Sequence, residues 1–284
     1  MKLNAYVLAA DPTWLRASVL AYYPYVEKLI VSYDADSRGF TGAPIRVEEC
    51  LALLRTIDTE SKIEFLPGHH IASDKDYLGA DTQQRSEALA HAALGADWVL
   101  QIDTDEVLPN WSPVEEALAT AESLQLPAVE WPLRVLFRRL RDGSYLEVVT
   151  DTGSPHFEYA TIAVRPGIEL VECRRTAGSF LRPIVRGDRS SLQLRRPPVS
   201  GEHRAEILDA GEAIWHNSWA RSPAAIREKI ASWSHNQGAA SRLYYYRTWL
   251  PAPFTWRVLR RFHPVAPELW YRLQKSAPPP VDDD

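Results

Sequence analysis

The chain has 284 residues and a net charge of −5, with 45% hydrophobic and 24% charged residues. This mixture is that of an ordinary globular protein and excludes a disordered, collagen-like or coiled-coil chain. The acidic balance does not attract polyanions, which excludes a general nucleic-acid binder. Cys50 and Cys173 match neither a disulfide framework nor a metal-binding spacing, so we expect reduced thiols.

The N-terminal residues contain no basic stretch followed by a long apolar run, and no apolar run reaches the about 18 residues that a bilayer span needs. We therefore expect a cytoplasmic protein without a leader peptide.

The first half of the sequence alternates short apolar runs with segments of helical spacing, a pattern typical of βαβ units around a mostly parallel sheet. Strands are predicted at residues 3–10, 28–33, 62–66 and 98–102. Helices are predicted at residues 12–23, 47–57 and 82–94. The polar turn from Asp34 to Gly39 follows the second strand, and Asp103, Asp105 and Glu106 follow the fourth. Acidic side chains are therefore expected at the C-terminal ends of strands.

Beyond residue 110 the pattern predicts a helix at 112–124 and then a more antiparallel half, with another helix beginning at Ser222-Pro223. Its strands are predicted at residues 128–137, 145–150, 159–165 and 212–216. Residues 174–204 combine many arginines with Pro and Gly and are predicted to be loop-rich. A mobile flap and a solvated irregular surface both remain open for them.

The clearest signal is the apolar run Trp98-Val99-Leu100-Gln101-Ile102, which leads directly into Asp103-Thr104-Asp105-Glu106. Carboxylates crowded at a strand end repel one another unless a cation, a ligand or solvent relieves the repulsion. A divalent cation does so well, because Mg²⁺ and Mn²⁺ prefer oxygen ligands and bridge carboxylates to phosphate oxygens. Asp-x-Asp alone is common, so a solvated strand end remains the competing interpretation.

The surrounding residues favour the metal. The stretch Gln84-Arg85-Ser86-Glu87-Ala88-Leu89, with Gly95-Ala96-Asp97-Trp98 and Asp103-Thr104-Asp105-Glu106, resembles the central segment of family-2 glycosyltransferases with a GT-A fold. Ser86 stands where that family usually has Asn. The stretch Trp215-His216-Asn217-Ser218-Trp219 resembles bacterial members that decorate lipopolysaccharide cores or related glycans.

The resemblance implies an α/β fold, with a GT-A-like (Rossmann-like) mixed sheet flanked by helices and a more antiparallel C-terminal half. Residues 1–240 would form the glycosyltransferase domain, with 1–110 as its nucleotide-sugar-binding half and 111–240 as its acceptor half. Residues 241–284 would form a C-terminal aromatic and basic helical extension with a tail.

The resemblance also implies metal-dependent transfer of a sugar from a nucleotide-diphosphate sugar to an acceptor hydroxyl, with inversion. Mn²⁺ or Mg²⁺ would be held by Asp105 and Asp103, and His216 would be a further ligand. The residues implied for donor binding are Ala10, Asp11, Asp34, Asp36, Arg85, Asp103 and Lys229.

Inversion needs a general base near the acceptor hydroxyl. The sequence offers Asp151, Glu158, Glu202 and Glu206 after the Asp-x-Asp motif. We expect Glu202 to be the base, with Asp151 as the second candidate.

Two other functions compete with this one. A haloacid-dehalogenase-like phosphatase would use Asp103 as nucleophile, but it needs a later lysine followed by an acidic pair. Lys229 and Lys275 are the only lysines after Asp105, and Lys229 is followed only by Glu268 and the terminal aspartates, so this order cannot be assembled. A catalytically silent GT-A-like protein that binds a nucleotide or sugar remains the alternative.

The acceptor is expected to be a glycan, a lipid-linked compound or a small molecule. Residues 244–271 mix aromatic side chains with arginines. They fit a C-terminal helix that packs its tryptophans on the core. They also fit a peripheral contact at a membrane, which would place the protein at the inner face of that membrane.

Overall fold

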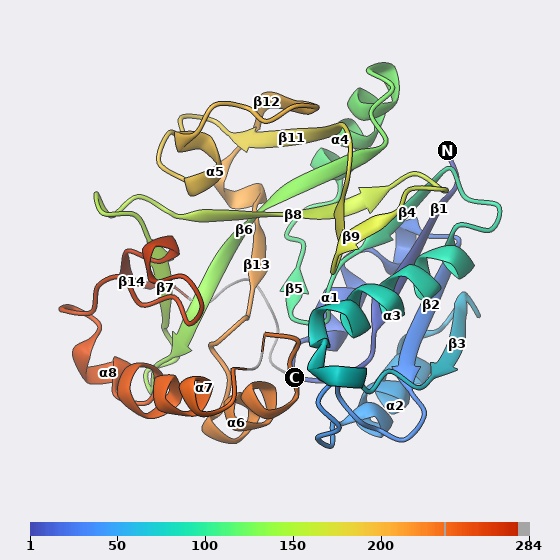
Figure 1. Cartoon of the computed structure of the whole chain (residues 1–284). Helices are drawn as coiled ribbons and strands as arrows, with labels where there is room; N and C mark the ends of the chain where they lie inside the picture. Colours follow the sequence, from blue (N-terminus) through green and yellow to red (C-terminus); the bar gives the residue numbers. More distant parts are fainter. Residues whose placement is uncertain (236, 278–284) are drawn as a thin grey trace.

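A computed structural model describes residues 1–235 and 237–277 and is built around one large mixed sheet (Figure 1). Its strands are β1 (Leu3–Leu8), β2 (Lys28–Asp34), β3 (Ile63–Gly68), β4 (Trp98–Gln101), β5 (Glu106–Val107), β6 (Ala128–Arg139), β7 (Tyr145–Val149), β8 (Phe157–Val164), β9 (Leu170–Glu172), β10 (Arg175–Thr176), β11 (Phe180–Val185), β12 (Glu202–Leu208), β13 (Ile214–His216) and β14 (Arg272–Ser276). Hydrogen-bonded neighbours follow the order β12-β11-β6-β8-β4-β1-β2-β3.

Helices cover both faces of the sheet. They are α1 (Leu15–Leu20), α2 (Val47–Ile57), α3 (Tyr77–Ala92), α4 (Ser112–Ser123), α5 (Leu192–Arg195), α6 (Pro223–Ser232), α7 (Ala239–Tyr244) and α8 (Ala252–Thr255). Because successive side chains of a strand point to opposite faces, Ala5 and Val7 of β1 join one core cluster with residues of α1, α2 and α4. Tyr6 joins a second cluster with residues of α3.

The parallel half follows the sequence pattern closely. Strands β1 to β4 are mutually parallel in the order β3-β2-β1-β4, as alternating strands and helices predict. Helix α2 has the predicted bounds and buries its apolar stripe. Helix α3 begins one turn earlier than predicted, because the side chain of Asp76 accepts a hydrogen bond from the Gly79 N–H at 3.0 Å and caps it.

The second half is more antiparallel. Strand β8 runs antiparallel between β4 and β6, and β6 also pairs antiparallel with β7. The predicted α/β class, a Rossmann-like mixed sheet flanked by helices with a more antiparallel C-terminal half, is therefore confirmed.

The arginine-rich segment 174–204 is only in part the loop-rich region that the sequence predicts: residues 186–191 and 196–201 are irregular, but the segment also contains a core strand. Strand β11 lies inside this segment, is buried along its whole length and pairs in parallel with β12 and β6. Arg182 of β11 donates to Glu130 and Glu202, at side-chain exposures of 4%, 14% and 0%. Arg182 thus links β11 to both of its neighbours in the sheet, β6 and β12. Arg175, Arg186, Arg189 and Arg195 of the same segment remain exposed.

The C-terminal segment packs on the sheet. Strand β14 pairs antiparallel with β7, and Trp249 and Trp270 are buried in a cluster with Phe137 and Trp219. Of the two interpretations of this segment, the packing of tryptophans on the core is confirmed, although Trp270 lies two residues before β14 and is not on a helix. The division at residue 240 stays a prediction, and the tail at 278–284 lies outside the described residues. In the part of the chain that the structure describes, no helix has the length and apolar character that crossing a membrane requires.

Candidate functional site

A pocket of about 530 Å³ lies at the carboxyl ends of β1, β2 and β4. In open α/β sheets this edge is where ligands bind. The predicted site residues that line the pocket are Ala10, Asp11, Asp34, Arg85, Asp103, Asp105, His216 and Lys229. The fold therefore brings most of the predicted donor site together from six separate stretches of sequence.

Asp103 is held in place by arginines. Arg85 of α3 donates from Nη1 and Nη2 to the two carboxylate oxygens, at 2.8 and 3.3 Å, and its Nε donates to Asp81 at 2.7 Å. Arg174 lies 3.7 Å from the same carboxylate. Burial acts to raise the pKa of Asp103, but the two arginines outweigh it and hold this pKa below its ordinary value. The structure thus uses Arg85, a predicted donor contact, to fix Asp103.

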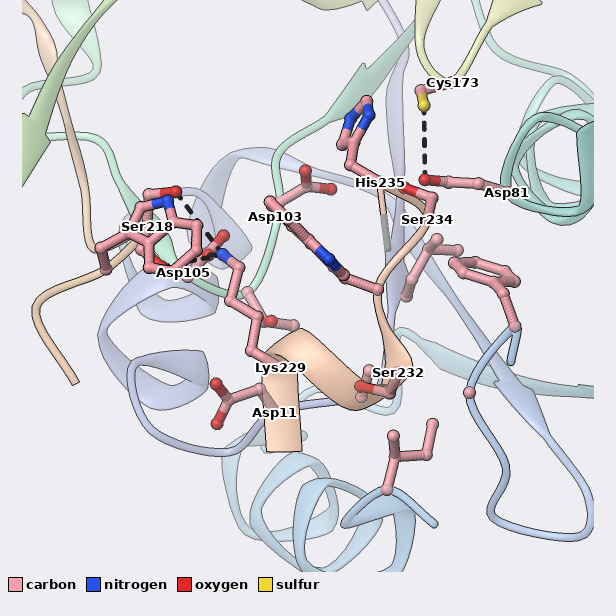
Figure 2. A pocket seen from close by; sticks show the side chains of 18 of the residues that line it. Asp11, Asp81, Asp103, Asp105, Cys173, Ser218, Lys229, Ser232, Ser234 and His235 are labelled. Carbon is pink, nitrogen blue, oxygen red and sulfur yellow. Dashed lines mark hydrogen bonds and ion pairs between the residues drawn. The ribbon is translucent and has the colours of Figure 1, made fainter. Parts of the chain in front are cut away.

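Asp105 faces a different set of cations, which come from the end of β13 and from the chain that follows it. Its Oδ2 accepts from Arg221, and it lies 3.6 Å from Nζ of Lys229 and 3.7 Å from Nε2 of His216. Figure 2 shows Lys229 reaching from α6 toward Asp105 and Ser218, whose carbonyl oxygen accepts from Nζ at 2.8 Å.

The charges in this group act on one another. Burial acts to raise the pKa of Asp105, but Lys229, Arg221 and His216 hold it well below its ordinary value. Burial acts to lower the pKa of His216, but Asp105 raises it above its ordinary value. Burial and the neighbouring Arg221 lower the pKa of Lys229 to about 8. This side of the pocket, called the cationic wall below, therefore places three basic side chains, Arg221, Lys229 and His216, around the ionised carboxylate of Asp105.

Arg221 ties the ends of two parallel strands together. It donates both to Asp105 after β4 and to Asp11 after β1, and Asp11 also accepts from Arg46 at 2.8 Å. Burial acts to raise the pKa of Asp11, but Arg221 and the hydrogen bonds from Thr13 lower it. The sequence contained Arg221 directly before Ser222, which caps α6 by accepting from the Ala225 N–H. Arg221 was not among the predicted site residues, although it lies between the Trp215–Trp219 stretch and Lys229.

The two acids of the turn after β2 differ in their surroundings. Asp34 lines the pocket, but its oxygens accept backbone N–H groups of Asp36, Arg38 and His70 at 3.1, 2.9 and 2.9 Å. Its carboxylate is therefore engaged in shaping the turn. Asp36 is exposed, lies 3.2 Å from His69 and is not among the pocket-lining residues. The structure does not bring Asp36 to the predicted donor site.

The two predicted bases also lie away from the pocket. Glu202 is buried on β12 among Arg182, Arg196 and Arg204, whose nitrogens bind both its oxygens. These arginines engage both carboxylate oxygens, which leaves Glu202 a weak base. Asp151 is half exposed in a turn and lies 3.8 Å from Arg195. Neither residue lines the pocket.

Glu158 of β8, the candidate that was not preferred, does line the pocket. Its Oε1 accepts from Nε1 of Trp270 at 2.5 Å. Among the described residues, Glu158 and Asp34 are the two carboxylates of the pocket that form no ion pair. The sequence offered Glu158 without a reason to prefer it, because its partner Trp270 lies 112 positions away.

The predicted Mn²⁺ or Mg²⁺ would need oxygen and nitrogen ligands that are free of competing cations. Asp105 and His216 lie together, but Arg221 and Lys229 surround the same carboxylate and would repel a divalent cation. A metal-bound histidine normally donates its second ring N–H to an acceptor. Nδ1 of His216 is instead buried without a partner within the described residues, which also contain no group of three or more metal-ligating side chains. The arrangement does not fit the metal, which stays a prediction from sequence.

Comparisons with known proteins leave the family open. No family model matches the sequence, and no curated protein matches it.

Several solved structures are similar over part of the chain. One is 4-diphosphocytidyl-2C-methyl-D-erythritol synthase from Anaerococcus prevotii, with 12% identity, coverage of 58% of this chain and 70% of that one, and a TM-score of 0.33. A second is residues 1–349 of TarS from S. aureus, with 14% identity, coverage of 50% of this chain and 37% of that one, and a TM-score of 0.33. A third is a CMP:2-keto-3-deoxy-manno-octonic acid synthetase complexed with CTP, with 13% identity, coverage of 58% of this chain and 74% of that one, and a TM-score of 0.32. At this level the similarity assigns neither a family nor an activity.

Proposed function

We propose that this chain is a glycosyltransferase that moves a sugar from a nucleotide-diphosphate sugar to a hydroxyl group of a glycan, lipid-linked or small-molecule acceptor, with inversion. The observation that carries the proposal is the convergence of Arg221, Lys229 and His216 on Asp105, at the ligand-binding edge of a Rossmann-like sheet. The resemblance of the Asp-x-Asp segment to family-2 glycosyltransferases supports the same conclusion.

The cationic wall suits the main electrostatic demand of glycosyl transfer. As the bond from the anomeric carbon to the diphosphate breaks, negative charge grows on the departing diphosphate. Positioned cations stabilise such charge, and arginine does so with a planar fork of N–H donors. Each terminal nitrogen of Arg221 donates one hydrogen bond to a carboxylate and retains a second N–H. Lys229 adds a point charge beside it.

Glu158 has the properties that the general base needs. The base accepts the proton of the acceptor hydroxyl while that oxygen bonds to the anomeric carbon and the diphosphate leaves with the bonding electrons. A carboxylate bound to arginines is a weak base, which disfavours Glu202. Glu158 has one oxygen oriented by Trp270, and no cation among the described residues pairs with it.

The donor is tested by thermal shift with UDP-, GDP-, CMP- and dTDP-sugars, each with Mn²⁺ and with EDTA. A donor at 100 times its dissociation constant stabilises the protein by about 2.7 kcal/mol. We expect a shift with one nucleotide that persists in EDTA. Stabilisation by none of the donors would contradict the proposed function. A shift that requires Mn²⁺ would instead assign the charge neutralisation to a metal.

The base is tested with Glu158→Gln. We expect the donor shift to be retained and sugar transfer to fall by at least about 100-fold, because only proton abstraction is lost. Glu228→Gln is the matched control, since Glu228 also lines the pocket but is 53% exposed and near Arg46. A donor shift without donor hydrolysis or transfer in the wild type would favour the silent binding protein.

A further inference from the structure

A stripe of exposed apolar side chains follows the helical run from α7 through the π-helical turn Tyr245–Trp249 to α8 and just beyond. It consists of Leu243, Tyr246, Leu250, Phe254 and Val258, which are 48, 62, 40, 88 and 77% exposed. Their spacing of three or four residues places them on one face of a helix. The residues between them that pack on the core, Tyr245, Trp249 and Ala252, are buried. This run is therefore apolar on two faces, one of which is open to solvent.

The same segment carries only positive charge. Five arginines are exposed along it, namely Arg242, Arg247, Arg257, Arg260 and Arg261. Across the described part of the chain, none of them forms an ion pair with a carboxylate. The sequence from 237 to 266 contains no Asp or Glu, although the whole chain has a net charge of −5. Positive charge is therefore concentrated on the same segment as the exposed apolar stripe.

We propose that this face docks on the surface of an anionic lipid bilayer, with Phe254 and Val258 entering the interface and the arginines binding lipid headgroups. Exposed apolar side chains gain free energy by leaving water for the acyl boundary, and each basic residue near an anionic surface adds to the attraction. A second copy of the chain is a poorer partner, because an isologous contact would bring the arginines of both copies together.

The docking face continues along the chain into the pocket. Pro264, Val265 and Ala266 follow Arg261 after two residues and line the pocket. Trp270, which orients Glu158, lines it as well. Docking would therefore hold the pocket near the bilayer. This consequence rests on the proposed function and favours an acceptor hydroxyl that is carried by a membrane lipid.

The test is sedimentation of the full chain with vesicles of phosphatidylcholine mixed with phosphatidylglycerol, and with vesicles of phosphatidylcholine alone. We expect binding to the anionic vesicles that weakens as salt is added. Phe254→Ser with Val258→Ser should weaken binding by at least about tenfold, because both side chains lose their apolar burial. The matched control is Leu94→Ser with Leu124→Ser, which changes leucines that are 70 and 51% exposed elsewhere. This control should bind like the wild type.

Three outcomes would overturn the proposal: no binding to anionic vesicles, equal binding to both vesicle types, or unchanged binding of the Phe254 and Val258 variant. A dimer in sedimentation equilibrium that this variant dissociates would assign the face to a second copy instead. The donor thermal shift of the same variant should match the wild type. Because vesicle binding needs no donor, a missing donor shift would count against the proposed function alone.

Discussion

Two arginine-rich segments of this chain differ in whether carboxylates pair with their arginines. In residues 174–204, Arg182 lies between Glu130 and Glu202, and all three are largely buried. In residues 242–261 the arginines are exposed, and no described carboxylate pairs with them. The difference shows that the partner of an arginine, more than its abundance, decides whether a basic segment stabilises the fold or is available for binding.

The physical reason is desolvation. A buried charge costs several kcal/mol unless an opposite charge and hydrogen bonds compensate it, so buried arginines occur with carboxylates in fixed geometry. An exposed arginine keeps its water and needs no partner. Its contribution to stability is small, and its charge remains available to a ligand.

The largest effect is expected from Arg182→Met. This change leaves Glu202 and Glu130 buried beside fewer cations, and breaking such a pair costs about 3 to 5 kcal/mol. Urea unfolding measures the loss. The double change Arg182→Met with Glu130→Gln should recover part of it, because one uncompensated charge is removed as well. A loss below about 1 kcal/mol would mean that the buried pair does not hold these strands together.

The pH dependence of stability tests the pairing of Glu202 with its arginines. Burial acts to raise the pKa of Glu202, but hydrogen bonds from Arg204 and the Val199 N–H, with the charge of Arg182, lower it from 4.5 to about 2. The stabilisation is therefore complete above pH 4.5 and is lost as the pH falls through about 2. It amounts to about 3 kcal/mol. Glu202→Gln should unfold with a shallower pH dependence across this window, and an unchanged slope would contradict the lowered pKa.

The sequence predicted the parallel half well, because its signals are local. The apolar spacing in 47–57 marks a helix within one segment, and Asp103 and Asp105 follow their strand directly. Prediction from the sequence failed where the decisive contact joins residues that are far apart in the chain. Arg182 meets Glu130 from 52 positions away, so β11 appeared to be a loop. Glu202 was chosen as the base for the same reason, since nothing local shows which carboxylates face arginines.

A pocket arginine is an intermediate case, because Arg221 is buried and paired but lines the pocket in which we propose that the donor binds. Arg221→Met should weaken donor binding by about 10- to 100-fold, the range expected when charged hydrogen bonds are lost. Isothermal titration with the donor that gives a thermal shift measures it. Arg46→Met is the comparison, since Arg46 also lines the pocket and pairs with Asp11 but, among the described residues, forms no ion pair with Asp105. An equal loss in both variants would mean that the link from Arg221 to Asp105 adds nothing to donor binding.

The smallest effect is expected from Arg257→Ala with Arg260→Ala. Both side chains are exposed and, among the described residues, meet a neighbouring ring or backbone carbonyl groups, so the free energy of unfolding should change by no more than about 0.5 kcal/mol. Urea unfolding of this variant and of Arg182→Met, measured in parallel, compares the two losses of unfolding free energy. If the surface variant lost more than about 1 kcal/mol, its arginines would also support the fold, and the distinction between the two segments would fail. Near-wild-type stability combined with weaker binding to anionic vesicles would show that one residue type serves architecture in one segment and recognition in the other.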